Sequence, residues 1–291
     1  MKERAIEKSK DRLEIMEEIE KLEREGRFDV DPEKDPPTIV LTPDNVDYLK
    51  EKSKSKIKAK VANTVGKKFL DEILRNNKLI IKEVHGIENL DSLKTGAMIT
   101  CNHFNPFDSF TIEKVYRESV VFKTKKLYKV IREGNYTNFP GFYGFLFRNC
   151  DTLPLSSNKK TMIEFIKAVD KILKNGDLIL IYPEQSLWWN YKKPKPLKDG
   201  AFKLATRSNV PVVPIFITMK DSGIMGSDGF YVKEYYVYIE EPIYPNMNLS
   251  DKENINYMRD KNYAIWKKVY EDFYKIPLTY TTVKKEDENK E

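Results

Sequence analysis

The sequence predicts an α/β fold, with a mostly parallel central sheet flanked by helices and an N-terminal helical appendage. From residue 79 onward, short apolar runs alternate with stretches of helical periodicity. The apolar runs are hydrophobic at successive positions, as expected of strands buried on both faces of a parallel sheet. The chain has 291 residues, of which 40% are hydrophobic, so it can bury the core of one large domain.

The first 45 residues do not follow this alternation. Residues 1–30 carry eight basic and ten acidic side chains, and their apolar residues recur at helical spacing. This pattern predicts a charged amphipathic helix that ends near Gly26. Residues 31–45 contain four prolines and are expected to form an extended linker.

Residues 46–78 are expected to form a basic amphipathic helix, over about 46–76. Its apolar residues lie four apart: Ile57, Val61, Val65, Phe69 and Ile73. Residues 50–68 hold eight lysines and one acid. Two interpretations are open: the helix packs on the main domain through its apolar stripe, or it lies on an anionic membrane surface.

The main domain is expected over residues 79–278, followed by a disordered tail over residues 279–291. Strands are expected at 79–86, 96–101, 119–125, 177–183 and 210–218, with a late strand pair or an edge strand at 231–244. Helices are expected near 158–174, 199–208 and 255–275.

Composition and charge exclude several classes of protein. The longest apolar runs, Leu178–Tyr182 and Val210–Thr218, are far shorter than the roughly 18 residues of a spanning helix. We also expect no signal peptide, and two cysteines favour a reducing cytoplasm. The net charge of +6 permits an anionic partner, but no motif that reads bases is present, so we expect no nucleic acid partner.

His103 and Asp108 are the first candidates for chemistry. An apolar strand runs into Asn102 and His103, and ligands bind at such strand ends in α/β proteins. If a helix begins near Pro106, its first turn brings Asp108 back toward the imidazole. A carboxylate on one ring nitrogen fixes the tautomer, so the other nitrogen can act as a general base. From spacing alone, a purely structural histidine is an open alternative.

A metal site is the rival interpretation. Cys101, His103, Asp108 and Cys150 supply ligand types, but no paired Cys-x-x-Cys or His-x3-His spacing accompanies them, so we expect no metal. The sequence also lacks a G-x-S-x-G nucleophile elbow and a glycine-rich phosphate loop.

Glu184 marks a second candidate region, because it directly follows the apolar run at 177–183. The lysines that follow would suit an anion such as a phosphate, or would form a solvated loop: Lys192, Lys193, Lys195 and Lys198. Trp188 and Trp189 suit a lipid interface or the wall of an acyl-chain site. The aromatic run at 139–147 is expected in the core, or alternatively along an acyl-chain channel or a membrane-facing surface.

Four motifs, in this order, resemble the glycerolipid acyltransferase family (1-acyl-glycerol-3-phosphate and related lysophospholipid acyltransferases). They are NHFNPFD at 102–108, IYPEQS at 181–186, KDGAFKLA at 198–205 and VPVVPI at 210–215. The resemblance covers about residues 84–219, just under half of the chain. It includes the family's His-x4-Asp box (HX4D) and its Pro-Glu box.

The resemblance implies roles for these residues. His103 takes the proton from the acceptor hydroxyl as that oxygen attacks an acyl thioester, and Asp108 orients and stabilises His103, without a covalent acyl-enzyme. Glu184 helps to build the acceptor site. Substrate binding is also assigned to Asn102, Gln185, Ser186, Lys192, Lys193 and Lys198. The donor is acyl-CoA or acyl carrier protein, and no cofactor is expected.

Two departures from the family pattern bear on the acceptor. Gln185, Ser186 and Leu187 stand where the family has Gly-Thr-Arg, and that arginine usually contributes to recognition of the acceptor phosphate. The second family box also has no arginine where Ser156 aligns. The acceptor is therefore lysophosphatidate, a lysophospholipid with a larger headgroup, or another alcohol.

The sequence thus predicts an O-acyltransferase of phospholipid biosynthesis or remodelling. Its expected partners are an acyl thioester donor, a lysolipid acceptor and an anionic membrane surface. We expect it in the cytoplasm, peripheral on the inner face of the cell membrane. The alternatives are an acyltransferase for a non-phosphate lipid or alcohol, and a non-catalytic lipid-binding protein.

Overall fold

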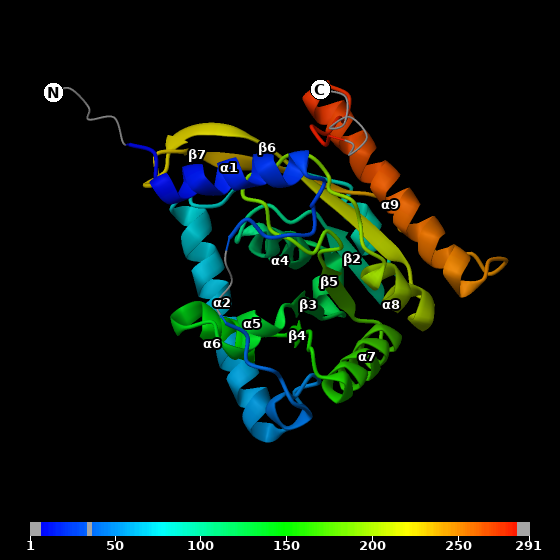
Figure 1. Cartoon of the computed structure of the whole chain (residues 1–291). Coiled ribbons are helices and arrows are strands. Elements are labelled where there is room, and N and C mark those ends of the chain that lie inside the picture. Colours follow the sequence, from blue (N-terminus) through cyan, green and yellow to red (C-terminus); the bar gives the residue numbers. More distant parts are fainter. Residues whose placement is uncertain (1–6, 34–36, 284–291) are drawn as a thin grey trace.

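The computed structural model describes residues 7–33 and 37–283 and contains one seven-stranded sheet (Figure 1). The strand order is β1-β7-β6-β2-β5-β3-β4, and all neighbouring pairs are parallel except β6 with β7. The predicted α/β class with a mostly parallel sheet is confirmed. The strands are β1 (Ile80–His85), β2 (Ala97–Cys101), β3 (Leu127–Ile131), β4 (Thr152–Pro154), β5 (Leu178–Ile181), β6 (Val212–Met225) and β7 (Tyr231–Ile239).

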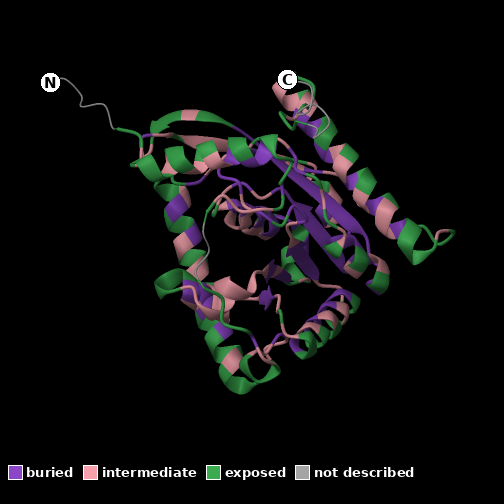
Figure 2. Cartoon of the chain, in the orientation of Figure 1, coloured by how far each residue is buried: buried purple, intermediate pink, exposed green. Residues whose placement is uncertain are grey.

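Helices cover both faces of the sheet. Because side chains alternate along a strand, Ile99 of β2 joins the cluster under α2 and α4, whereas Met98 joins the cluster under α7 and α8. The central strands are accordingly the most buried part of the chain (Figure 2). The helices are α1 (Lys10–Arg24), α2 (Ser53–Arg75), α3 (Ile87–Asp91), α4 (Asp108–Glu118), α5 (Glu133–Thr137), α6 (Gly141–Asn149), α7 (Lys159–Lys174), α8 (Gly200–Ser208) and α9 (Asp251–Tyr274), with 3-10 turns η1 (Pro43–Asn45) and η2 (Val120–Lys123).

Of the two N-terminal helices, the first ends where the sequence predicts, and the second begins later than predicted. α1 ends at Arg24, and Gly26 then adopts the left-handed conformation expected after a helix end. α2 begins at Ser53, several residues later than expected. The reason is Asp47, whose carboxylate accepts hydrogen bonds from the backbone N–H groups of Glu51 and Lys52, both at 3.1 Å, and holds this segment as a loop.

The apolar stripe of α2 is buried only in its C-terminal half. Leu70 and Ile73 are 1% and 2% exposed, whereas Ile57 and Val61 are 67% and 51% exposed. Residues four apart rotate by about 40° per step around an α-helix, so a stripe of this spacing turns away from the core over its length. The C-terminal half of the stripe therefore packs on the main domain, whereas the membrane interpretation of its exposed half stays a prediction.

The strand expected at 119–125 is absent, and this prediction was wrong. The segment forms η2, in which the side chain of Ser119 accepts a hydrogen bond from the backbone of Val121 at 3.2 Å. The strand of this region is β3, which follows η2. The sequence analysis also missed β4, whose three residues are too few to show periodicity.

Residues 279–283 are not a disordered tail, because they pack against α1. The backbone N–H of Thr281 donates to the carboxylate of Glu23 at 2.9 Å, and that of Val283 donates to the carbonyl of Arg24 at 3.1 Å. The rest of the predicted tail, 284–291, lies outside the described residues. Across the described ranges, no helix combines the length and apolar character needed to cross a bilayer.

Candidate active site

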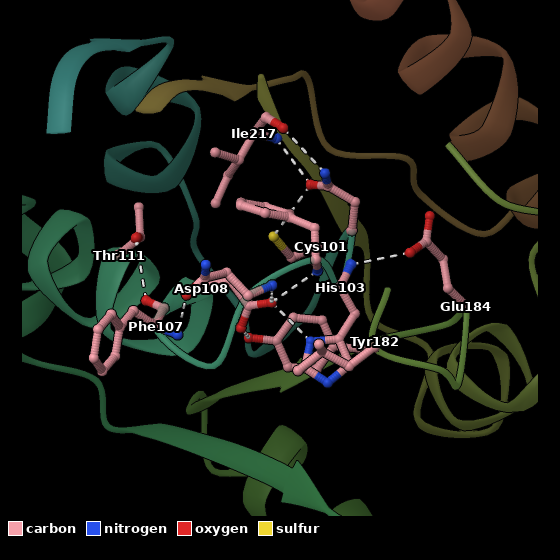
Figure 3. A network of polar contacts seen from close by, with 12 residues as sticks. Cys101, His103, Phe107, Asp108, Thr111, Tyr182, Glu184 and Ile217 are labelled. Atoms are coloured by element: carbon pink, nitrogen blue, oxygen red, sulfur yellow. Dashed lines mark hydrogen bonds and ion pairs between the residues drawn. The ribbon is translucent and has the colours of Figure 1, made fainter. Parts of the chain in front are cut away.

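The candidate residues meet at one edge of the sheet. β2 and β5 are parallel neighbours, so their carboxyl ends lie side by side. His103 follows β2, and Tyr182 and Glu184 follow β5 (Figure 3). Backbone hydrogen bonds join the two loops: Trp188 N–H donates to His103 C=O at 3.2 Å, and Asn190 N–H donates to Phe104 C=O at 2.8 Å.

His103 and Asp108 form a hydrogen-bonded pair. His103 Nδ1 lies 2.7 Å from Asp108 Oδ2, and the same oxygen accepts from Phe104 N–H at 3.2 Å. Asp108 is the first residue of α4, where the helix dipole favours a negative charge. Its side chain is 1% exposed and that of His103 is 24% exposed. With the Nδ1 proton donated to Asp108, the Nε2 lone pair is left to accept a proton.

Tyr182 completes this pair, and the sequence analysis missed it. Its ring stacks on the His103 imidazole at 4.0 Å between centroids, and its O–H donates to Asp108 Oδ1 at 2.7 Å. Burial raises the pKa of Tyr182 well above its usual value, so the phenol keeps the proton that it donates. The sequence feature that could have identified Tyr182 as a site residue is its position at the end of a strand, immediately before Pro183 and Glu184.

Glu184 supports the backbone of the site. It is 2% exposed, and its carboxylate accepts from the N–H of His103 at 2.9 Å and from the N–H of Lys195 at 2.8 Å. Burial raises the pKa of Glu184, and the nearby Lys195 ammonium opposes this effect. Glu184 thus links the loop after β5 to the residue that carries the imidazole.

Lys195 is the buried counter-charge of Glu184. Its Nζ lies 3.4 Å from Glu184 Oε2 and donates to the carbonyl and hydroxyl oxygens of Ser186 at 2.6 and 2.9 Å. Burial lowers the pKa of Lys195, because its side chain is 1% exposed. Lys195 was predicted as one of four lysines that would suit an anion or form a solvated loop, and its burial beside Glu184 was not predicted. Composition alone does not distinguish a buried lysine from a solvated one.

The central part of the chain matches a known family of proteins. A sequence model described as Acyltransferase matches residues 82–218. The match covers just under half of the chain and includes the loops that carry His103 and Glu184. The resemblance stated from the motifs is therefore confirmed.

Two proteins of known name are similar to this chain. The first is 1-acyl-sn-glycerol-3-phosphate acyltransferase BAT2, chloroplastic, of Brassica napus, 27% identical over 166 residues, which are 56% of this chain and 45% of that protein. The chain thus aligns with less than half the length of this curated relative. The second is the crystal structure of the LPA acyltransferase PlsC from Thermotoga maritima, with 17% identity, a TM-score of 0.48 and coverage of 80% of this chain and 87% of that chain.

Three of the predicted substrate-binding residues have surroundings that differ from those expected. Asn102 is 2% exposed, and its amide bonds both backbone groups of Ile217, at 2.9 and 3.0 Å, so it fixes β6 to the end of β2. The Ser186 hydroxyl is buried and donates to Phe28 C=O at 2.6 Å. Gln185 is exposed at φ 67°, a left-handed conformation that the family's glycine adopts without strain.

The predicted anion-binding lysines do not form one open cluster. Lys193 Nζ lies 2.6 Å from the Glu23 carboxylate, and Lys198 Nζ lies 2.8 Å from that of Asp29. Lys192 lies over the ring of Tyr274, with its Nζ 5.5 Å from the centroid. The N-terminal segment, far away in sequence, supplies the carboxylates that compensate two of these charges.

Trp188 and Trp189 are buried, so the prediction of a lipid interface there was wrong. They are 0% and 7% exposed and pack in a cluster with Ile19, Leu22 and Phe28. Exposed aromatic side chains are found on α6, where Phe142 and Tyr143 contact Phe69 of α2. Phe69 also contacts Phe107 and Phe110, the neighbours of Asp108, so an aromatic surface reaches the site.

The described residues contain no group of three or more His, Cys, Asp or Glu side chains that could hold a metal ion. Cys101 lies in the core and Cys150 is partly buried, and both are free thiols. At the edge where β2 and β5 end, the structure places an imidazole oriented by a carboxylate beside a loop held by backbone hydrogen bonds.

Proposed function

We propose that the chain transfers a fatty acyl group from a thioester, acyl-CoA or acyl carrier protein, to the hydroxyl of a lysophospholipid. The observation that carries this proposal is the His103–Asp108 pair at 2.7 Å, with the imidazole partly exposed at the carboxyl end of β2. The match of residues 82–218 to the Acyltransferase family model and the name of the Brassica napus relative support it. No cofactor takes part in this reaction.

Proton transfer at His103 Nε2 is the central step of the proposed mechanism. Nε2 takes the proton of the acceptor hydroxyl while the oxygen attacks the thioester carbonyl. The imidazolium is stabilised by the Asp108 carboxylate and returns the proton to the departing thiolate. A positioned base typically contributes about 10²–10⁴-fold, and holding both substrates together supplies further acceleration.

A non-catalytic lipid-binding protein is the less favoured function. Such a protein has no need of the network that fixes the imidazole. Here Asp108 orients Nδ1, Tyr182 holds Asp108, and Glu184 holds the backbone of His103. Three independent contacts on one side chain and its loop favour catalysis.

Release of free thiol from acyl-CoA with a panel of lysolipids tests the proposed function. We expect release that depends on both the thioester and a lysophospholipid, because the hydroxyl must be present to attack. The wild-type chain incubated without a lysolipid is the control. Thiol release that is absent with every lysolipid, from both acyl-CoA and acyl carrier protein donors, would contradict the proposal.

We further propose that the enzyme acts peripherally on an anionic membrane, on the cytoplasmic inner face of the cell membrane. The N-terminal half of α2 supports this proposal. Ile57 and Val61 are exposed, and lysines flank them on the helix surface. Apolar side chains enter the headgroup region while lysines attract anionic lipid.

Reversing the charge of Lys54, Lys60 and Lys68 to Glu is expected to weaken binding to phosphatidylserine vesicles at least tenfold, since each lysine contributes about 1 kcal/mol near such a surface. Vesicle sedimentation measures this loss, and thiol release from short-chain soluble substrates is expected to persist. The matched control reverses three exposed lysines of α9: Lys252, Lys261 and Lys267. Equal binding by the two triple variants would overturn the role of α2.

A further inference from the structure

The tyrosine that follows β5 contacts both members of the histidine–aspartate pair. The O–H of Tyr182 donates to Asp108 Oδ1 at 2.7 Å, and His103 Nδ1 lies 2.7 Å from Asp108 Oδ2. The Tyr182 ring also stacks on the imidazole, with 4.0 Å between the centroids and 19° between the planes (Figure 3). One side chain thus acts on the carboxylate through a hydrogen bond and on the imidazole through its aromatic face.

The other histidine of the chain shows what is particular to this arrangement. His85 Nε2 lies 3.0 Å from Glu83 Oε2, and its ring stacks on Tyr238 with 4.7 Å between the centroids. Each histidine therefore has a carboxylate and a tyrosine beside it. Within residues 7–33 and 37–283, the Tyr238 hydroxyl has no hydrogen bond to Glu83, whereas at His103 the stacked tyrosine also donates to the carboxylate.

The Tyr182 hydroxyl keeps its proton beside Asp108. Burial, and then the charge of Asp108, raise the pKa of Tyr182 well above its usual value. The phenol therefore stays a hydrogen-bond donor over the whole pH range in which imidazoles titrate. Donation to one oxygen of a carboxylate disperses its negative charge, so Asp108 attracts a positive imidazolium less strongly than a carboxylate without this donor would.

The remaining titratable groups around the pair are neutral or compensated. Cys101 on β2 and Tyr235 on β7 are buried, and burial raises the pKa of both, so they stay uncharged. In the loop after β5, Glu184 lies 3.4 Å from the ammonium of Lys195. The carboxylate bonded to the imidazole is therefore the charge through which a hydroxyl donor can act on the ring.

The stacked ring of Tyr182 has the opposite effect. An aromatic face attracts a cation, so it favours the imidazolium over the neutral imidazole. The stack also fixes the plane of the imidazole, which keeps Nδ1 directed at Asp108. The hydroxyl and the ring of one side chain therefore oppose each other in their effect on the imidazolium.

We propose that Tyr182 is a positioning residue that holds the His103 ring against Asp108 and moderates the attraction of that carboxylate, so that the imidazole can both take a proton and return it. This inference rests on the proposed acyl transfer, in which Nε2 takes the proton of the hydroxyl and gives it to the departing thiolate. Asp108 without the hydrogen bond from Tyr182 would stabilise the imidazolium more and slow the return of the proton.

Tyr182→Phe and Tyr182→Leu separate the two effects, because Phe keeps the ring without the hydroxyl and Leu keeps neither. The measurement is kcat/KM for thiol release over about pH 5–9. We expect the acidic limb of the profile to move up by about 0.5–1 pH unit in Tyr182→Phe, a part of the strength of a hydrogen bond to a charged group. The limb of Tyr182→Leu is expected at lower pH than that of Tyr182→Phe, because the imidazolium loses the aromatic face.

Tyr238→Phe is the matched control, because Tyr238 stacks on His85 outside the site. Its pH profile is expected to equal that of wild type. A purely structural role of Tyr182 would lower kcat/KM at every pH and leave the acidic limb in place.

An NMR titration of the imidazole signals needs no substrate. The chain has two histidines, so His85→Ala assigns the signal of His103. We expect this signal to titrate at higher pH in Tyr182→Phe than in wild type. An unmoved or downward titration in a folded Tyr182→Phe chain overturns this inference alone, and a limb of Tyr182→Leu at or above that of Tyr182→Phe overturns the role of the ring. Absence of thiol release by the wild type with every lysolipid overturns the proposed function and this inference together.

Discussion

His103→Ala is expected to lower thiol release by about 10²–10⁴-fold, which is the contribution of a positioned general base. In the proposed mechanism, Nε2 of the imidazole accepts the hydroxyl proton, and Asp108 and Tyr182 only position the ring. Steady-state release of thiol from acyl-CoA with a saturating lysolipid measures the effect. Binding to vesicles is expected to stay near the wild-type level, because the proposed membrane-binding surface lies on α2 and does not include His103.

The second histidine of the chain supplies the matched control for this substitution. His85 ends β1, its side chain is 47% exposed, and it stacks on Tyr238 at 4.7 Å. His85→Ala removes the same chemical group without touching the site, so its activity is expected to equal that of wild type. If a folded His103→Ala chain keeps substantial activity, the proposed mechanism is contradicted.

The His103–Asp108 pair was predictable because it is local. Five residues separate the two, and the first turn of α4 brings the carboxylate back to the ring. Glu184 was predictable for a similar reason, since the carboxyl ends of neighbouring parallel strands meet at one edge. Residue spacing and strand order therefore determine the centre of the site.

The surroundings of the site were not predictable, because they come from distant parts of the chain. Glu23 pairs with Lys193, 170 positions away, and no local pattern selects that lysine over its neighbours. For the same reason, Trp188 was wrongly predicted at a lipid interface. It is buried by contacts with α1 and Phe28, which lie far away in sequence. The lysines after Glu184 were predicted to suit an anion. The carboxylates that pair with two of them, Glu23 and Asp29, lie near the start of the chain, so the local sequence does not show them.

Lys195→Met is expected to destabilise the fold by about 3–5 kcal/mol, the usual cost of breaking a buried charge pair by removing one partner. The substitution leaves the Glu184 carboxylate buried without its counter-charge, which raises the pKa of Glu184 further. A carboxyl group whose pKa is raised by folding stabilises less as pH rises, because the unfolded chain ionises first. The loss measured by thermal or urea unfolding is therefore expected to be larger at about pH 8 than at about pH 5.

The double variant Glu184→Gln with Lys195→Met separates stability from function. It removes both buried charges, so most of the lost stability and most of the pH dependence are expected to return. Activity is expected to stay low, because a neutral amide holds the N–H groups of His103 and Lys195 less strongly than the carboxylate does. Lys195→Arg, which keeps the charge, is the matched single variant. A double variant as unstable as Lys195→Met would show that Lys195 acts through packing against Trp188 rather than as the counter-charge of Glu184.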